Sequence, residues 1–282
     1  MTAPTDESTL GGESGLEIYW CRWLPAGEPR AVVVIAHGAG EHSGRYEHVA
    51  ARLIAEGHAV YALDHRGHGR SAGKRALIDR IDNAVADLDA LVVLALGRHP
   101  NVPLFLLGHS MGGLIALSYT VRHQDRLTGL ILSGPLAALE AASPTQRAAA
   151  RVLSALAPGL GVVAVDPALV SRDPDVVRDY TTDPLVHHGK LPARTVAELA
   201  AAVDSFPTAV TAITVPTLIM YGSADALAPP AGSEMLRERI ASEDLTVKVY
   251  DGLYHEILNE PEQDTVLDDL CAWIAAHVAV AV

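Results

Sequence analysis

Short apolar runs rich in valine, isoleucine and leucine alternate along the chain with longer stretches of helical hydrophobic period. The run at 31–36 (AVVVIA) is apolar throughout, which is typical of a strand buried on both faces of a sheet. Further strands are predicted at 17–24, 58–63, 104–107, 130–133, 217–221 and 246–250. Helices are predicted at 45–56, 79–98, 111–122, 232–240 and 262–277. This alternation predicts a doubly wound, mostly parallel α/β sheet with helices on both faces.

The alternation is interrupted between 136 and 207, where we find no buried strand-like run and where prolines separate helical segments. A stretch of this kind inside a β-α array is best explained as a helical insertion, a cap or lid. We therefore expect a core formed by residues 1–135 and 208–282, with residues 136–207 as the cap. The length of 282 residues suits one large α/β domain with such an insertion.

Composition and charge exclude several classes of protein. Hydrophobic residues make up 49% of the chain, so a large core can form and global disorder is excluded. The 34 acidic residues outnumber the 21 basic ones, and a net charge of −13 without a basic patch argues against a nucleic-acid partner. The two cysteines, Cys21 and Cys271, lie far apart and fit neither a disulfide framework nor a cysteine-based zinc site.

The sequence contains no stretch that predicts a membrane span or an export signal. Residues 1–15 are polar and acidic, without the cationic start and apolar run of a signal peptide. The apolar stretch at 153–165 is too short for a bilayer and is broken by a proline and two glycines. We expect a cytoplasmic protein, and peripheral contact with a membrane stays open.

The segment Gly108-His109-Ser110-Met111-Gly112 fits the pattern G-x-S-x-G. A buried strand is predicted directly before it and a helix directly after it. That is the strand–turn–helix in which a tight turn lifts a nucleophilic serine above the edge of the sheet. The sequence therefore predicts Ser110 as a nucleophile. The alternative is a glycine-rich turn whose serine has no chemical role.

Two downstream loops carry the acid and the base that a weakly nucleophilic serine hydroxyl needs. In a fold of this type the order is nucleophile, acid, histidine, each on a loop after a strand. Asp225 follows the strand at 217–221, and His255 follows the strand at 246–250. Asp251 is the rival acid, but it precedes the histidine on the same loop. The alternatives are a helix-capping role for Asp225 and a structural role for His255.

The oxyanion of an acyl-transfer reaction needs preorganised backbone donors. One donor is expected from Met111, the residue after the nucleophile, and the second from the glycine-containing loop 37–40 after the first buried strand. We assign the second donor to the backbone N–H of Ala39.

The 13 histidines do not predict a metal site. There is no H-E-x-x-H pattern or Cys/His set, and no carboxylates stand at ligand spacing from them. Because serine-based ester hydrolysis needs neither metal nor cofactor, we expect none.

Several motifs together resemble those of the monoacylglycerol lipases, a serine-hydrolase branch of the α/β-hydrolase fold. The resemblance runs from about residue 15 to the end of the chain, and HGAGEHSGRY combined with YTTDPL is its most specific part. The motifs are HGAGEHSGRY (37–46), DHRGHGRS (64–71), GHSMGG (108–113), YTTDPL (180–185), GSAD (222–225) and GLYHE (252–256).

The resemblance implies hydrolysis of 1- or 2-monoacylglycerols to glycerol and a fatty acid. It also implies that a small polar pocket holds the glycerol hydroxyls, and Glu41, Arg45 and Tyr180 match that pocket, with His255 nearby. The alternatives are an Arg–Glu pair that fixes the loop and a buried tyrosine hydroxyl in the cap. Triacylglycerols are expected to be poor substrates, because such a pocket rejects extra acyl chains.

In the family the cap is a lipid-facing lid over an acyl tunnel, and Ala148–Val165, with Arg151 as its one charge, matches the apolar lip. The alternative for this segment is an ordinary buried helix pair. Two other functions stay open at this point. One is a different ester hydrolase, such as a lysophospholipase or a short-chain carboxylesterase, and the other is a non-catalytic binding protein that retains the fold.

Overall fold

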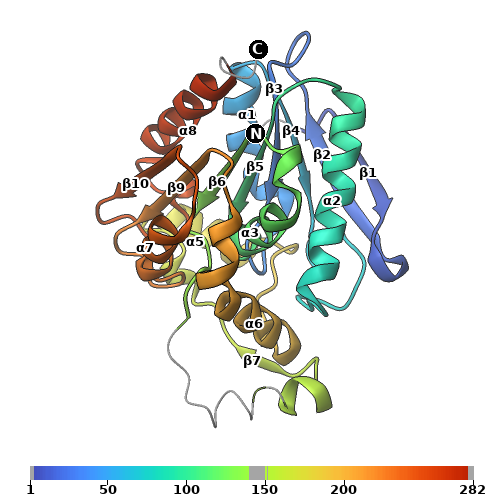
Figure 1. The fold of residues 1–282 in the computed structure, drawn as a ribbon. Coiled ribbons are helices and arrows are strands. Elements are labelled where there is room, and N and C mark those ends of the chain that lie inside the picture. The colour runs from blue at the N-terminus through green and yellow to red at the C-terminus, as the bar shows by residue number, and fades with distance from the viewer. Residues whose placement is uncertain (1–2, 140–149, 151, 279–282) are drawn as a thin grey trace.

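An eight-stranded sheet forms the centre of the protein (Figure 1). The structure is a computed structural model and describes residues 3–139, 150 and 152–278. In spatial order the strands are β1 (Asp6–Gly11), β2 (Glu17–Trp23), β4 (His58–Leu63), β3 (Ala31–Ala36), β5 (Leu104–His109), β6 (Gly129–Ser133), β9 (Thr217–Gly222) and β10 (Leu245–Tyr250). The pairs β1–β2 and β2–β4 are antiparallel, and the other neighbours are parallel. The prediction of a mostly parallel sheet is confirmed.

Helices cover both faces of this sheet. They are α1 (Glu47–Ala55), α2 (Ile81–Arg98), α3 (Met111–His123), α7 (Pro230–Arg239) and α8 (Gln263–Val278). Two further helices, α5 (Pro174–Thr182) and α6 (Ala193–Ala209), belong to the segment between β6 and β9. In β3, Val32 and Val34 join the apolar core under α2, α3 and α7, whereas Val33 and Ile35 join the core under α1 and α8. Because successive side chains of a strand point to opposite faces, only an entirely apolar run fills both cores.

The edge strand β1 is absent from the sequence-based prediction. Its residues, Asp6–Gly11, are mostly polar and exposed, and they pair antiparallel with β2. An edge strand of this kind has no apolar alternation, so the pattern of hydrophobic residues gives no sign of it.

The segment between β6 and β9 holds α5 and α6 and also two short strands, β7 (Gly161–Val163) and β8 (Leu191–Pro192). The two strands pair antiparallel and form a separate small sheet. These two strands are additions to the expected helical insertion; strands of three and two residues are too short to show a period in the sequence. In Figure 1, α6 and β7 lie beyond the lower end of the main sheet.

Exposed apolar side chains gather around β7. Leu156 is 81% exposed, and Val152 and Leu160 are each more than half exposed. The apolar lip expected at Ala148–Val165 lies partly outside the described residues, at positions 148, 149 and 151. Among the residues that the structure describes, no helix is both long enough and apolar enough to cross a membrane.

Candidate active site

Ser110 stands at the sharp turn between β5 and α3. Its backbone has φ 54° and ψ −117°, a conformation that residues with a side chain rarely adopt. The turn is held by close packing, since a Cβ on Gly112 would lie 2.0 Å from the carbonyl oxygen of Ala36. Only glycine allows α3 to start this close to β3, and the turn that results leaves Ser110 half-buried above the sheet.

Asp225 and His255 come together from the loops that follow β9 and β10. Oδ2 of Asp225 lies 2.7 Å from Nδ1 of His255, and both side chains are almost fully buried. Oδ1 of Asp225 accepts backbone hydrogen bonds from Leu227 (2.9 Å) and Ala228 (2.8 Å), so the carboxylate is held by both oxygens. The rival acid Asp251 is exposed and accepts a hydrogen bond from the hydroxyl of Ser223 instead.

The charge of Asp225 sets the basicity of His255. Burial acts to lower the pKa of His255, but the hydrogen bond and charge of Asp225, aided by Glu256 and Glu41, raise it above the ordinary value. A neighbouring imidazole behaves in the opposite way, because burial and the nearby His255 lower the pKa of His109 to about 3. His109 is therefore neutral, and its Nδ1 donates to the carbonyl oxygen of Ser133 at 2.9 Å.

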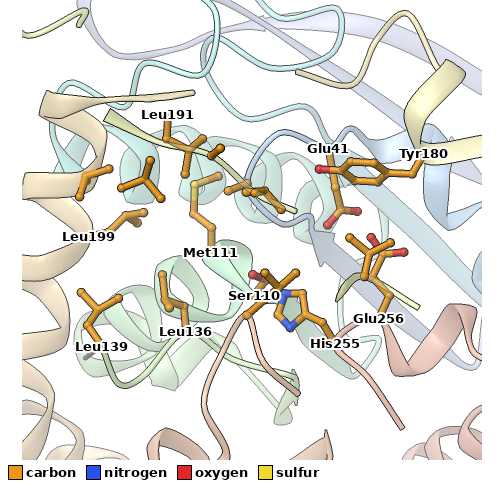
Figure 2. Close-up of a pocket in the computed structure, with 17 residues that line it drawn as sticks. Glu41, Ser110, Met111, Leu136, Leu139, Tyr180, Leu191, Leu199, His255 and Glu256 are labelled. Atoms are coloured by element: carbon orange, nitrogen blue, oxygen red, sulfur yellow. The ribbon is translucent and has the colours of Figure 1, made fainter. Parts of the chain in front are cut away.

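Ser110 and His255 line the same cavity, and Figure 2 shows the imidazole directly beside the serine. Since Nδ1 of His255 is engaged by Asp225, Nε2 is the nitrogen left to face the site. Ala39 and Met111 line the cavity next to the serine. Met111 is the first residue of α3, so no earlier turn of that helix accepts a hydrogen bond from its backbone N–H.

The cavity has a volume of about 200 Å³ and two chemically different ends. In Figure 2 the labelled apolar side chains, Met111, Leu136, Leu139, Leu191 and Leu199, lie on one side of Ser110, and Glu41, Tyr180 and Glu256 lie on the other. The apolar lining comprises Met111, Leu136, Leu139, Val163, Ala164, Val165, Val170, Leu191, Val196, Leu199 and Leu227. Most of these residues belong to the segment between β6 and β9, so that segment supplies most of the apolar wall.

The polar end is built around the guanidinium of Arg45, whose side chain is 10% exposed. Arg45 donates to both oxygens of Glu256, at 2.6 and 2.8 Å, and lies 3.1 Å from Oε2 of Glu41. Its Cζ is 4.8 Å from the centre of the Tyr180 ring. The two glutamates and the tyrosine line the cavity, whereas Arg45 lies behind them and is not part of the lining.

The structure places the residues expected from the sequence as follows. Ser110, His255, Ala39 and Met111 share the cavity, and Asp225 is hydrogen-bonded to the histidine from behind. Of the three expected head-group residues, Glu41 and Tyr180 line the cavity and Arg45 does not.

Sequence reasoning gave Glu256 no role, although it lines the cavity and pairs with Arg45 from 211 residues away. Its place directly after His255 was the one available signal, because that histidine is itself a candidate residue of the site. That signal does not reveal Arg45 as the partner of Glu256, because only folding brings the two residues together.

Known proteins resemble this chain over nearly its whole length. A family model described as "Serine aminopeptidase, S33" matches residues 27–262. A monoacylglycerol lipase of Mycolicibacterium smegmatis is 48% identical over 99% of this chain and 100% of that protein. The human monoglyceride lipase is 37% identical over 94% of this chain and 89% of that protein. The crystal structure of the Paleococcus ferrophilus monoacylglycerol lipase, 34% identical, superimposes with a TM-score of 0.83 and covers 93% of this chain and 99% of that one.

The fold, the elbow serine and these similarities agree with one another. The sheet is mostly parallel, with helices on both faces, and the fold superimposes on that of the structural relative over 93% of this chain. The chain therefore belongs to the monoacylglycerol lipase family, a group of serine hydrolases with the α/β-hydrolase fold.

Proposed function

We propose that the protein hydrolyses monoacylglycerols to glycerol and a free fatty acid through an acyl-serine intermediate. The observation that carries this proposal is the hydrogen-bonded pair Asp225–His255 beside Ser110, at the junction of an apolar and a polar half of one cavity. An ester whose acyl chain lies in the apolar half and whose glycerol lies in the polar half has its carbonyl carbon next to the serine.

In the proposed reaction the Ser110 hydroxyl attacks the ester carbonyl while Nε2 of His255 takes its proton. The imidazolium then gives that proton to the departing glycerol oxygen, and the acyl group stays on the serine. A water molecule attacks the acyl-serine with His255 again as the base, and the fatty acid leaves. Asp225 orients the imidazole and stabilises its charged form, which is consistent with the raised pKa of His255.

The tetrahedral intermediate of each step carries a negative oxygen. We assign its two donors to the backbone N–H groups of Ala39 and Met111, which line the cavity beside Ser110. The donor from Ala39 is preorganised, because a hydrogen bond from another segment fixes its loop, residues 37–40. The backbone N–H of His187 donates to the carbonyl of Gly40 at 2.8 Å, so the loop is fixed to the segment between β6 and β9.

We assign the glycerol hydroxyls to Glu41 and Tyr180, and we give Arg45 the role of holding the polar end together. This differs from the direct substrate contact that the family resemblance implies for Arg45, and it follows from the position of the guanidinium behind the glutamates. A pocket closed by these side chains has no room for further acyl chains, so triacylglycerols are expected to be poor substrates.

We propose that residues 136–207 act as the cap and that its exposed apolar residues, such as Leu156, touch the lipid surface that holds the substrate. The protein is then a cytoplasmic enzyme that contacts membranes peripherally. The net charge of −13 argues against a nucleic-acid partner.

Turnover of monoolein, oleoyl-lysophosphatidylcholine and triolein by the wild type and by Ser110→Ala tests this function. The wild type should prefer monoolein, and Ser110→Ala should lose turnover of every ester. A clear preference for the lysophospholipid would replace the monoacylglycerol assignment by a lysophospholipase. The absence of any turnover by the wild type would favour a binding protein.

A further inference from the structure

The polar end of the cavity combines one cation with two anions. A guanidinium near an ester-hydrolysing site is a natural partner for a phosphate, because its parallel N–H groups match two phosphate oxygens. In this protein those N–H groups are already used. Glu256 accepts both, at 2.6 and 2.8 Å, and Glu41 lies 3.1 Å from the same side chain.

The two carboxylates belong to the wall of the cavity, whereas their cationic partner Arg45 does not. Glu41 and Glu256 line the cavity, and the described residues that line it include neither a lysine nor an arginine. Glu41 also lies close to the nucleophile, since a Cβ on Gly38 would be 2.3 Å from Oε1 of Glu41 and 3.1 Å from Cβ of Ser110. A head group bound beside Ser110 therefore meets carboxylate oxygens first.

We propose that Glu256, by occupying the guanidinium of Arg45, makes this end of the cavity anionic and so selects neutral glycerol head groups over phosphate-bearing ones. The inference rests on the proposed monoacylglycerol hydrolysis and adds the residue that determines the class of head group. A neutral polyol can hydrogen-bond to carboxylates, whereas a phosphate is repelled by them and meets no lysine or arginine among the described residues of the lining.

The pKa values of the two glutamates agree with the role given to Glu256 as the partner of Arg45. Burial raises the pKa of Glu41; the charge of Arg45 opposes this effect, and the charge of Glu256 adds to it. Burial acts on Glu256 in the same direction, but the charge and hydrogen bonds of Arg45 outweigh it and lower the pKa of Glu256. Glu256 is therefore the carboxylate that balances the guanidinium. The other titratable groups that act on this pair are Tyr46, His48, His109, Tyr180 and His255.

Two esters that differ only in the phosphate test the inference: 1-monoolein and 1-oleoyl-lysophosphatidic acid, in identical micelles of a nonionic detergent. At about pH 8.5 carboxyl groups are ionised even when their pKa is raised by several units. For the wild type, kcat/KM for the phosphate ester should be at least about 100-fold below that for monoolein, because like charges meet in a desolvated pocket. Near-equal values would overturn the inference without the need for any variant.

Glu256→Gln keeps the size of the side chain and removes one negative charge. The ratio of the two kcat/KM values, phosphate ester over monoolein, should rise at least about 10-fold in this variant. The reason is that less negative charge then remains to neutralise the guanidinium of Arg45 and to repel the phosphate. Glu256→Asp keeps the charge and should stay closer to the wild-type ratio than Glu256→Gln does. A ratio that changes less than about twofold in Glu256→Gln, in protein whose circular dichroism is that of the wild type, would overturn the inference.

Glu260→Gln is the matched control. Glu260 is a buried glutamate near the same loop, and it pairs with Arg172 at 2.7 Å outside the cavity lining. If Glu260→Gln loosens the loop, it should change kcat/KM for both substrates by the same factor. The ratio of the two kcat/KM values should therefore stay at the wild-type value. Failure of the wild type to hydrolyse monoolein would refute the proposed function, whereas an unchanged ratio in Glu256→Gln with intact monoolein hydrolysis refutes this inference alone.

Discussion

Replacement of Asp225 by asparagine should inactivate the enzyme through the tautomer of His255. Oδ1 of Asp225 accepts two backbone N–H groups, at 2.8 and 2.9 Å, and Oδ2 faces Nδ1 of His255 at 2.7 Å. Asparagine has one oxygen, which the two backbone donors require, so its amide NH2 turns toward the imidazole. Nδ1 must then accept, which puts the proton on Nε2, the nitrogen that has to take the proton of the serine.

The size of the loss follows from two contributions. A buried hydrogen bond to a charged group contributes about 1.5–3 kcal/mol, which alone slows the reaction about 10- to 150-fold. The wrong tautomer removes the base as well, and together they should lower kcat on the order of 10⁴-fold.

The assay is steady-state hydrolysis of monoolein by Asp225→Asn, with Asp251→Asn as the control. Asp251 is the other acid near His255 in sequence, but it is exposed and bonded to Ser223, so its variant should keep wild-type kcat. The reasoning is refuted if Asp225→Asn stays within about tenfold of wild-type kcat, or if the control loses activity to the same extent.

Three further predictions concern the turn at Gly112, the histidine base and the contact between Asp183 and His42. Gly112→Ala should lower the free energy of unfolding by at least about 2 kcal/mol in urea titrations, since its Cβ would lie 2.0 Å from the carbonyl oxygen of Ala36; an unchanged midpoint contradicts this. Because the base must be neutral and the pKa of His255 is raised, kcat/KM should be lost as the pH falls through a value above about 6.5, and an acidic limb below that pH argues against His255. Asp183→Asn weakens the 2.8 Å contact of Asp183 with Nε2 of His42 and should lower the free energy of unfolding by about 0.5–1.5 kcal/mol; no change in denaturation would leave this contact without energetic weight.

The sequence predicts the buried parallel strands well, because a run such as 31–36 has to be apolar to fill two cores at once. It does not predict β1, which lies at the edge of the sheet and keeps polar side chains in solvent. It also misses β7 and β8, whose few residues show no period. The order of strands in the sheet is likewise not predicted, since it depends on which faces the helices cover.

The residues of the candidate site divide in the same way. Ser110, Asp225 and His255 could be proposed from the sequence because each follows a predicted strand and the carboxyl ends of parallel strands meet at one edge. The pairing of Arg45 with Glu256 could not, because the two residues are 211 positions apart and neither of their motifs indicates the other as a partner. Only the fold shows that Glu41 and Glu256 line the cavity and that Arg45 does not.

The claim that the serine of the elbow is the activated nucleophile is tested most directly by covalent labelling. The protein is treated with a fluorophosphonate, the modified peptide is identified by mass spectrometry, and Ser110→Ala is treated in parallel. We predict one adduct, on Ser110, formed in step with the loss of monoolein hydrolysis and absent from Ser110→Ala. Equal labelling of Ser110→Ala, or an adduct on another residue that tracks the loss of activity, would contradict the account.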